Sequence, residues 1–184
     1  MARGVCAGAM RRRPEAAESP AMFSGSTLSF VAMTPEPFAY VTRECAMANV
    51  GATVSDAFCT LGAALDQAKV QPWGPPMARY RNIAEGRITI DLGFPVQEAA
   101  LASLRAAGLQ TGMTGGGQAM RALHLGSSEK LTFTYDAVLD AIRASGREPA
   151  EEMWERYFSG PETPPDASRT EVLWPVKPAP ASYE

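Results

Sequence analysis

Hydrophobic and polar residues alternate along several stretches of the chain and recur every three to four residues along others, which predicts a mixture of strands and helices. The stretch RITIDLGF at 87–94 shows the strand pattern most clearly, with Ile88, Ile90 and Leu92 on one face and Thr89 and Asp91 on the other. In all, we expect strands at 26–33, 38–46, 77–81, 87–94, 118–125, 153–158 and 169–174, and helices at about 55–70, within 95–108 and at 130–144.

Residues that interrupt regular structure separate these elements. The proline-containing segment 34–37 predicts a turn, because proline cannot donate a hydrogen bond within a sheet. Ser55 and Asp56 are typical N-cap residues for the first helix, and Gly108 is a typical residue to end the second. The three glycines at 115–117 lack the Lys-Ser/Thr of a phosphate-binding loop, so we interpret them as a flexible link.

The order of elements in the first part of the chain repeats in the second. Phe58 and Tyr80 are 22 residues apart, as are Tyr135 and Tyr157, which gives the repeat a shift of 77 residues. We therefore expect one domain at 26–177 with two halves at about 26–96 and 109–177, between a disordered tail at 1–25 and a C-terminal tail at 178–184. A chance similarity between two amphipathic segments is the alternative.

The repeat also predicts the fold class. Each half is expected to contain a strand, a helix and two further strands, with one more strand ahead of the first half. Two such units can pair their strands into one curved antiparallel sheet. We therefore predict an α+β fold of duplicated βαββ units, with helices on one face of the sheet and a concave ligand pocket on the other.

The composition indicates a single globular domain and argues against several functional classes. Of 184 residues, 46% are hydrophobic and 20% are charged, which is too apolar for a disordered chain. The net charge of −3 argues against direct nucleic-acid binding, which normally requires a basic surface. Because no apolar run approaches the roughly 18 residues of a membrane span, we expect no membrane association.

Cysteine and histidine are too few for a disulfide framework or a metal site. The three cysteines include no CxxC pair, which fits a reducing compartment, so we expect a cytoplasmic protein without a metal or cofactor. The one histidine, His124, lies in a predicted strand before a Gly-Ser pair, and we expect a structural role for it.

An acid among aromatic residues is the strongest candidate for chemistry. In the strand predicted for MWERYF, Met153, Glu155 and Tyr157 share one face. A buried carboxylate is costly unless it is compensated, so a site keeps one to hold a cation or to move a proton, and aromatic rings add cation–π attraction. The repeat places Ala78 at the corresponding position, so only one half carries the acid. The alternative is an edge glutamate that pairs with an arginine such as Arg169.

Other aromatic and methionine side chains are candidate walls of the same pocket. Aromatic rings offer flat apolar surfaces, and methionine adapts its shape to a ligand. For each of these residues, simple core packing is the alternative. The predicted ligand-binding residues are Glu155, Tyr157, Met153, Tyr40, Trp73, Phe94, Trp174 and Met120.

Four segments carry a resemblance to a known family: SFVAMTPEPFAYVTRE at 29–44, ITIDLGFPV at 88–96, HLG at 124–126 and WERYFSGPETPPDASRTEVLWPV at 154–176. In this order they resemble the GyrI-like ligand-binding domains, which also serve as effector domains of multidrug-sensing transcription regulators. The resemblance implies a duplicated βαββ fold and a pocket between the halves that contains an acid, at the position of Glu155. About 25 residues precede the domain, too few for the regulators' helix-turn-helix domain, so we expect the stand-alone form.

The resemblance implies two functions for Glu155. The first is the binding of amphipathic, cationic or aromatic small molecules, for sensing or sequestration, with Glu155 as the counter-charge. The alternative is a hydrolase that opens cyclopropane rings of DNA-alkylating natural products, in which Glu155 activates water and Tyr157 holds the substrate. A protein partner, as in the family's gyrase-inhibitor members, is a third and weaker expectation.

Overall fold

The structure, a computed structural model, describes residues 27–160 and 162–177. Its strands are β1 (Ser29–Met33), β2 (Pro37–Ala46), β3 (Met77–Ala84), β4 (Arg87–Pro95), β5 (Gln110–Met113), β6 (Gly117–Leu125), β7 (Met153–Tyr157) and β8 (Arg169–Pro175). Its helices are α1 (Val50–Ala68), α2 (Leu101–Ala106) and α3 (Leu131–Ala144), with 3-10 turns at Met47–Asn49, Glu98–Ala100, Ser128–Lys130 and Pro165–Ala167.

All eight strands belong to one curved antiparallel sheet, in the order β1-β6-β8-β7-β3-β4-β2-β5. The predicted α+β class is therefore confirmed.

The tails predicted at 1–25 and 178–184 lie outside the described residues. No helix within 27–160 or 162–177 is long and apolar enough to cross a membrane.

The strand order contains an exchange of edge strands between the two parts of the chain. β1 precedes β2 in sequence but pairs with β6, and β5 precedes β6 but pairs with β2. The connections that follow these two strands cross each other, where the Thr114 N–H donates to the Glu36 carbonyl and the Glu36 N–H donates to Thr114 Oγ1, both at 2.9 Å. The sequence did not predict β5, since this strand has only four residues and contains a glycine.

The three glycines at 115–117 belong to this crossing, and their interpretation as a flexible link is wrong. A Cβ on Gly115 would lie 2.9 Å from Nε1 of Trp154, and one on Gly116 would lie 2.8 Å from Cγ of Pro35. Gly117 already belongs to β6. At Gly115 and Gly116 the chain passes too close to its neighbours for a side chain, whereas Gly117 has a φ of 88°, which favours glycine.

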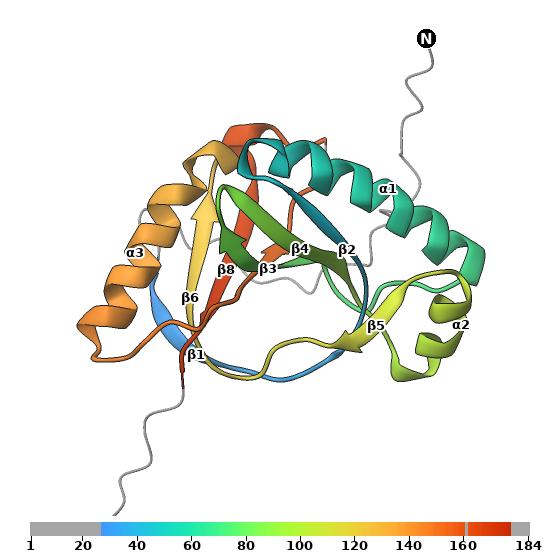
Figure 1. The fold of residues 1–184 in the computed structure, drawn as a ribbon, viewed down its shortest axis with the longest axis horizontal. Helices are drawn as coiled ribbons and strands as arrows, with labels where there is room; N and C mark the ends of the chain where they lie inside the picture. The colour runs from blue at the N-terminus through green and yellow to red at the C-terminus, as the bar shows by residue number, and fades with distance from the viewer. Residues whose placement is uncertain (1–26, 161, 178–184) are drawn as a thin grey trace, which may run out of the picture.

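The two long helices lie over the same face of the sheet, α1 against β2 and β4 and α3 against β6 and β8 (Figure 1). Their buried residues join one large hydrophobic core with the strand residues of that face. α1 begins at Val50 rather than near Ser55, because the preceding 3-10 turn continues directly into it and Val50 and Val54 pack against the core. It ends at Ala68, followed by Lys69 in the left-handed conformation with a φ of 55°.

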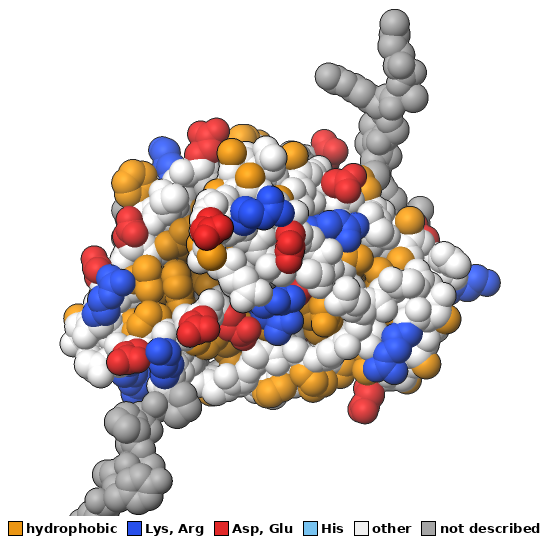
Figure 2. Space-filling model, in the orientation of Figure 1, with side chains coloured by type: hydrophobic (Ala, Val, Ile, Leu, Met, Phe, Trp, Pro, Cys, Tyr) orange, Lys and Arg blue, Asp and Glu red, His pale blue; other side chains and the backbone are white. Residues whose placement is uncertain are grey.

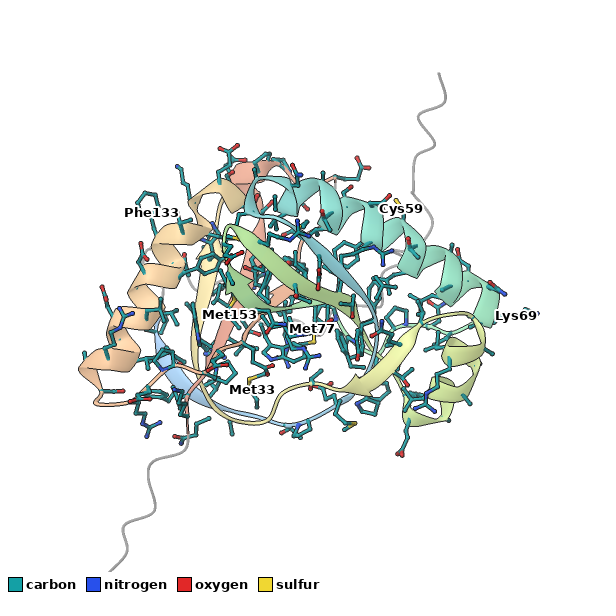
Figure 3. All side chains as sticks on the ribbon, viewed as in Figure 1. Met33, Cys59, Lys69, Met77, Phe133 and Met153 are labelled. Carbon is teal, nitrogen blue, oxygen red and sulfur yellow. The ribbon has the colours of Figure 1, made fainter. Side chains whose placement is uncertain are left out.

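The opposite face of the sheet has a smaller hydrophobic core and a buried ionic cluster. The core consists of Met33, Phe38, Met77, Ala119, Trp154 and Leu173. Figure 3 shows Met77 and Met153 near the middle of the sheet, and Phe133 and Cys59 on the helices around it. On the surface seen in Figure 2, acidic and basic side chains are interspersed.

Asp91 of β4 forms the centre of the ionic cluster and is 0% exposed. Arg79 Nε donates to its carboxylate at 2.8 Å, Arg81 Nε at 2.9 Å and Thr42 Oγ1 at 2.7 Å. Burial alone would raise the pKa of Asp91, but the hydrogen bonds from Arg81, Thr42 and Arg79 outweigh it, so the pKa lies below its ordinary value. The cluster therefore ties β2, β3 and β4 together.

Candidate functional site

Glu155 lies in the middle of the sheet, on the face that the helices cover. It stands opposite Ala78 in the β3–β7 pairing, which is the residue that the repeat assigns to its position. Its side chain is 1% exposed, and Tyr135 of α3 donates a hydrogen bond to Oε1. The expectation of a pocket on the face away from the helices is thus wrong for this acid, because the face toward the helices holds it.

Three tyrosine hydroxyl groups surround the carboxylate. Besides Tyr135, Tyr157 donates to Oε2 at 2.7 Å, and the Tyr80 hydroxyl lies 3.2 Å from Oε2 and 2.8 Å from the Tyr157 hydroxyl. Since Tyr80 has a single hydroxyl proton, it donates to one of these two oxygens at a time. We call these four residues the Glu155 cluster.

The cluster is built from corresponding positions of the repeat. Tyr80 corresponds to Tyr157, and Tyr135 of α3 corresponds to Phe58 of α1. The Phe58 ring lies edge-on to Tyr157, with 6.0 Å between centroids. The second half therefore supplies a carboxylate at Glu155 and a hydroxyl at Tyr135. The first half supplies a methyl group at Ala78 and a phenyl ring at Phe58, so the polar groups come from the second half at these positions.

Glu155 forms no ion pair with an arginine, lysine or histidine in the part of the chain that the structure describes. The alternative of an ion pair with Arg169 is wrong, because none of the ion pairs among the described residues joins these two side chains, and the Arg169 guanidinium lies over the Phe158 ring instead. Burial raises the pKa of Glu155, and the hydrogen bonds from the tyrosines offset this only in part. Burial and the charge of Glu155 raise the pKa of Tyr135 and Tyr157, so both stay protonated donors at neutral pH.

The structure brings most of the predicted ligand-binding residues to the face of Glu155, but not all of them. Met153, Met120 and Phe94 are buried in the large core there, and Tyr157 and Trp174 pack against it.

Two of the predicted residues lie elsewhere. Tyr40 packs against the core of the opposite face, stacked on Phe38 with 5.3 Å between centroids. Trp73 is 59% exposed beside a surface hollow. Neither side chain belongs to the large core that surrounds Glu155.

Tyr80 and Tyr135 were absent from the predicted site. The signal that could have identified them was the repeat, which pairs them with Tyr157 and Phe58.

His124 has the expected structural role, because its Nδ1 lies 2.8 Å from Thr134 Oγ1 and its Nε2 lies 3.0 Å from the Ser127 carbonyl oxygen.

The Glu155 carboxylate is closed off from solvent, and two surface hollows lie away from it. One, of about 270 Å³, is lined by Glu36, Pro37, Trp73, Val96, Gln97 and Glu98. The other, of about 260 Å³, is lined by residues of β1, β6, β7 and β8 together with Thr34 and Glu36. Among the described residues, no three His, Cys, Asp or Glu side chains are grouped to hold a metal ion. The chemistry open to the cluster is thus to hold an organic cation or to exchange a proton.

Solved structures share this fold at low sequence identity. SAV2435, in a structure with tetraphenylphosphonium bound, is 11% identical with a TM-score of 0.63, over 82% of this chain and 94% of that one. The C-terminal domain of EcmrR is 11% identical with a TM-score of 0.60, over 84% and 99%. A hydrolase from Listeria innocua is 13% identical with a TM-score of 0.57, over 82% and 91%.

These similarities agree with the fold that the GyrI-like resemblance implies, and at such identities they show the fold alone. No protein-family model matches the chain, and no curated protein matches it in sequence.

Proposed function

We propose that this chain binds an amphipathic organic cation that carries aromatic groups, with Glu155 as the counter-charge. The observation that carries the proposal is a buried carboxylate whose hydrogen-bond partners are all neutral hydroxyl groups. Hydroxyl groups solvate a negative charge but do not neutralise it, and a buried charge normally has a partner of opposite sign. A bound cation would supply that partner.

The surroundings of Glu155 suit the apolar part of such a ligand. Tyr157, Phe58 and Phe94 place aromatic rings next to one another, with 6.0 Å between centroids in each adjoining pair. Rings attract organic cations by about 0.5–2 kcal/mol per contact. The ligand of SAV2435, tetraphenylphosphonium, combines a positive charge with four phenyl rings, and this supports the same class of ligand here.

Binding requires local rearrangement, because the cluster is closed. We place the entry between α1 and α3, since these helices carry Phe58 and Tyr135 beside the acid. Phe58 is only half-buried and contacts Tyr157 by its edge, so a ligand ring can take over that contact when Phe58 turns outward. The contacts that the ligand gains then offset the free-energy cost of opening the cluster.

The test is calorimetric titration with tetraphenylphosphonium and, in parallel, with neutral triphenylphosphine oxide. The native chain should bind the cation and not the neutral compound. Glu155→Gln should weaken cation binding about tenfold or more, since it removes the charge and keeps the shape. Glu171→Gln is the matched control, because Glu171 lies on the opposite face and pairs with Arg156. Unchanged affinity in Glu155→Gln would contradict the proposal.

Hydrolysis is the second candidate, favoured by the raised pKa of Glu155. A carboxylate with a raised pKa is a better general base near neutral pH than an ordinary one. The test is to incubate the chain with a cyclopropane-containing alkylating agent and follow the loss of substrate over many equivalents. Turnover that disappears in Glu155→Gln would support a hydrolase, whereas binding of one equivalent without turnover would contradict it.

A further inference from the structure

Among residues 27–160 and 162–177, the strand β1 forms an edge of the sheet, and this edge carries few of the usual protections. It pairs with β6 along five consecutive residues, Ser29 to Met33, without a bulge. Edge strands of soluble proteins are normally protected by lysine, proline, a bulge or a very short length, because their free backbone groups can pair with another chain. The segment TLSFVAM at 27–33 contains no charged residue and no proline.

Apart from Ser29, the side chains of β1 are also apolar. Leu28 is 37% exposed and Phe30 is 36% exposed, and Ala32 between Val31 and Met33 is exposed as well. Apolar side chains beside unpaired backbone groups favour strand addition, since both the hydrogen bonds and the buried area contribute.

The other edge of the sheet is better protected. β5 has only four residues, and α2 packs against it. Arg105 of α2 donates a hydrogen bond to the hydroxyl of Thr111 on this strand. The two edges occupy equivalent places in the strand order, so the difference between them singles out β1 as the edge that accepts a partner.

We propose that β1 pairs with β1 of a second copy of this chain, antiparallel and about a two-fold axis, so that the two sheets become continuous. In such a pair, the residues before the central residue face the residues after it in the second copy, so these two sets of side chains must fit together. In a register centred on Val31, Phe30 lies opposite Ala32 of the second copy, on the face that the helices cover. A large side chain thus meets a small one at each of the two equivalent places.

The charges near the edge permit this pairing. Arg121 lies on β6, one strand away from the edge, and Arg147 covers the Phe30 ring at 4.3 Å and bonds to Gln118 of β6. In the dimer, β6 and its copy would be separated by three strand spacings, about 14 Å. This exceeds the screening length of about 8 Å at physiological salt, so repulsion between Arg121 and its copy is weak. Arg147 lies over Phe30 of the edge strand itself, so its copy comes nearer than this, and we expect the dimer to be weaker at low salt.

A single strand pair buries less than the roughly 1,200–2,000 Å² of a stable interface, so we expect a weak dimer that forms with rising concentration. The test is analytical ultracentrifugation of the full chain over a wide range of concentrations, where the mass should rise from 19.6 kDa toward twice that value. Hydrogen exchange at 29–33 should slow over the same range.

Ala32→Lys should weaken the dimer about tenfold or more, because it places a charge at the seam. Gln110→Lys is the matched control on β5, and it should leave the association unchanged. Circular dichroism would verify that both variants are folded, and Phe30→Glu offers a second test should Ala32→Lys fail to fold.

A chain that stays monomeric at every concentration would overturn the proposal, as would a dimer that tolerates both Ala32→Lys and Phe30→Glu. If removal of residues 1–25 converts a monomer into a dimer, the N-terminal segment of the same chain is the partner of β1 and the proposal is equally wrong.

Discussion

At the scale of single residues, two carboxylates are buried among the described residues, and their surroundings have opposite effects on them. Asp91 is surrounded by two arginines and a threonine hydroxyl, and its pKa is lowered. Glu155 has only tyrosine hydroxyls, and its pKa is raised by burial. The first carboxylate therefore stabilises the folded chain at neutral pH, whereas the second costs stability there.

Glu155→Gln should raise the stability of the chain at neutral pH. The folded state holds the proton of Glu155 more tightly than the unfolded state, so the free energy of unfolding falls as the pH rises from the ordinary glutamate pKa through the raised one. Each pKa unit corresponds to about 1.4 kcal/mol. Thermal melts at a series of pH values should show the advantage of the variant vanish in acid. A melting temperature below that of the native chain at neutral pH would contradict this account.

Asp91→Asn should lower the free energy of unfolding by about 1–3 kcal/mol, because hydrogen bonds to a charged group are lost while the arginines remain. The stabilisation from Asp91 is present above the ordinary aspartate pKa and is lost as the pH falls through the lowered one. Urea denaturation at neutral and acidic pH measures both effects. The deficit of the variant should shrink in acid, and a deficit that is equal at both pH values would rule out the charge as its origin.

At the scale of elements, the periodic pattern predicted most strands and helices, but two kinds of information were missing from it. The strand β5 has four residues around Gly112, too short and too irregular to show alternation. Alternation also shows that Met153, Glu155 and Tyr157 share a face, but it does not show which face the helices cover. That is decided by contacts distant in sequence, such as the one between Tyr135 and Glu155.

The repeat was more informative about the site than any motif. Its shift of 77 residues aligns Ala78 with Glu155, and these two residues stand opposite each other at the centre of the sheet. The same shift pairs the tyrosines of the cluster with their counterparts. It could not predict the hydrogen bonds among them, since these depend on how far β3 and α3 approach Glu155.

Gly93→Ala should destabilise the pairing of β2 with β4. A Cβ at this position would lie 2.1 Å from the carbonyl oxygen of Ala39 and 2.8 Å from Cα of Tyr40, so backbone would have to move. We expect a loss of about 3 kcal/mol or more in urea denaturation. Gly51→Ala in α1 is the control, because nothing lies within 4 Å of its Cβ and alanine favours the helix by up to about 1 kcal/mol. Equal effects of the two substitutions would contradict the close approach of β2 and β4.

At the scale of the whole molecule, each end of the sheet depends on a strand from the other part of the chain. β1 lies on β6, and β5 lies on β2. The two parts also meet at the β3–β7 pair in the centre. Three separate pairings therefore join them, which is more than a simple side-by-side arrangement of two units would provide.

A chain divided between α2 and β5 should behave as two mutually dependent fragments. Each fragment alone would lack the strands that pair across the division, in the pairs β1–β6, β2–β5 and β3–β7. We therefore expect its circular dichroism spectrum to be that of a largely unfolded chain. Mixed together, the fragments should regain the native spectrum and purify as one complex. Independent folding of either fragment would show that the exchanged strands contribute little to stability.

The exchange of edge strands also sets the order in which the protein can be completed during translation. Val31 leaves the ribosome well before its partner Ala119, which is synthesised only after both strands of the central hairpin. Until then β1 has no place in the sheet, and its uncharged segment is exposed to other nascent chains and to chaperones. β6 in turn joins the rest of the sheet through β8, so the pair of β1 and β6 is held in the native sheet only after β8 has been synthesised as well.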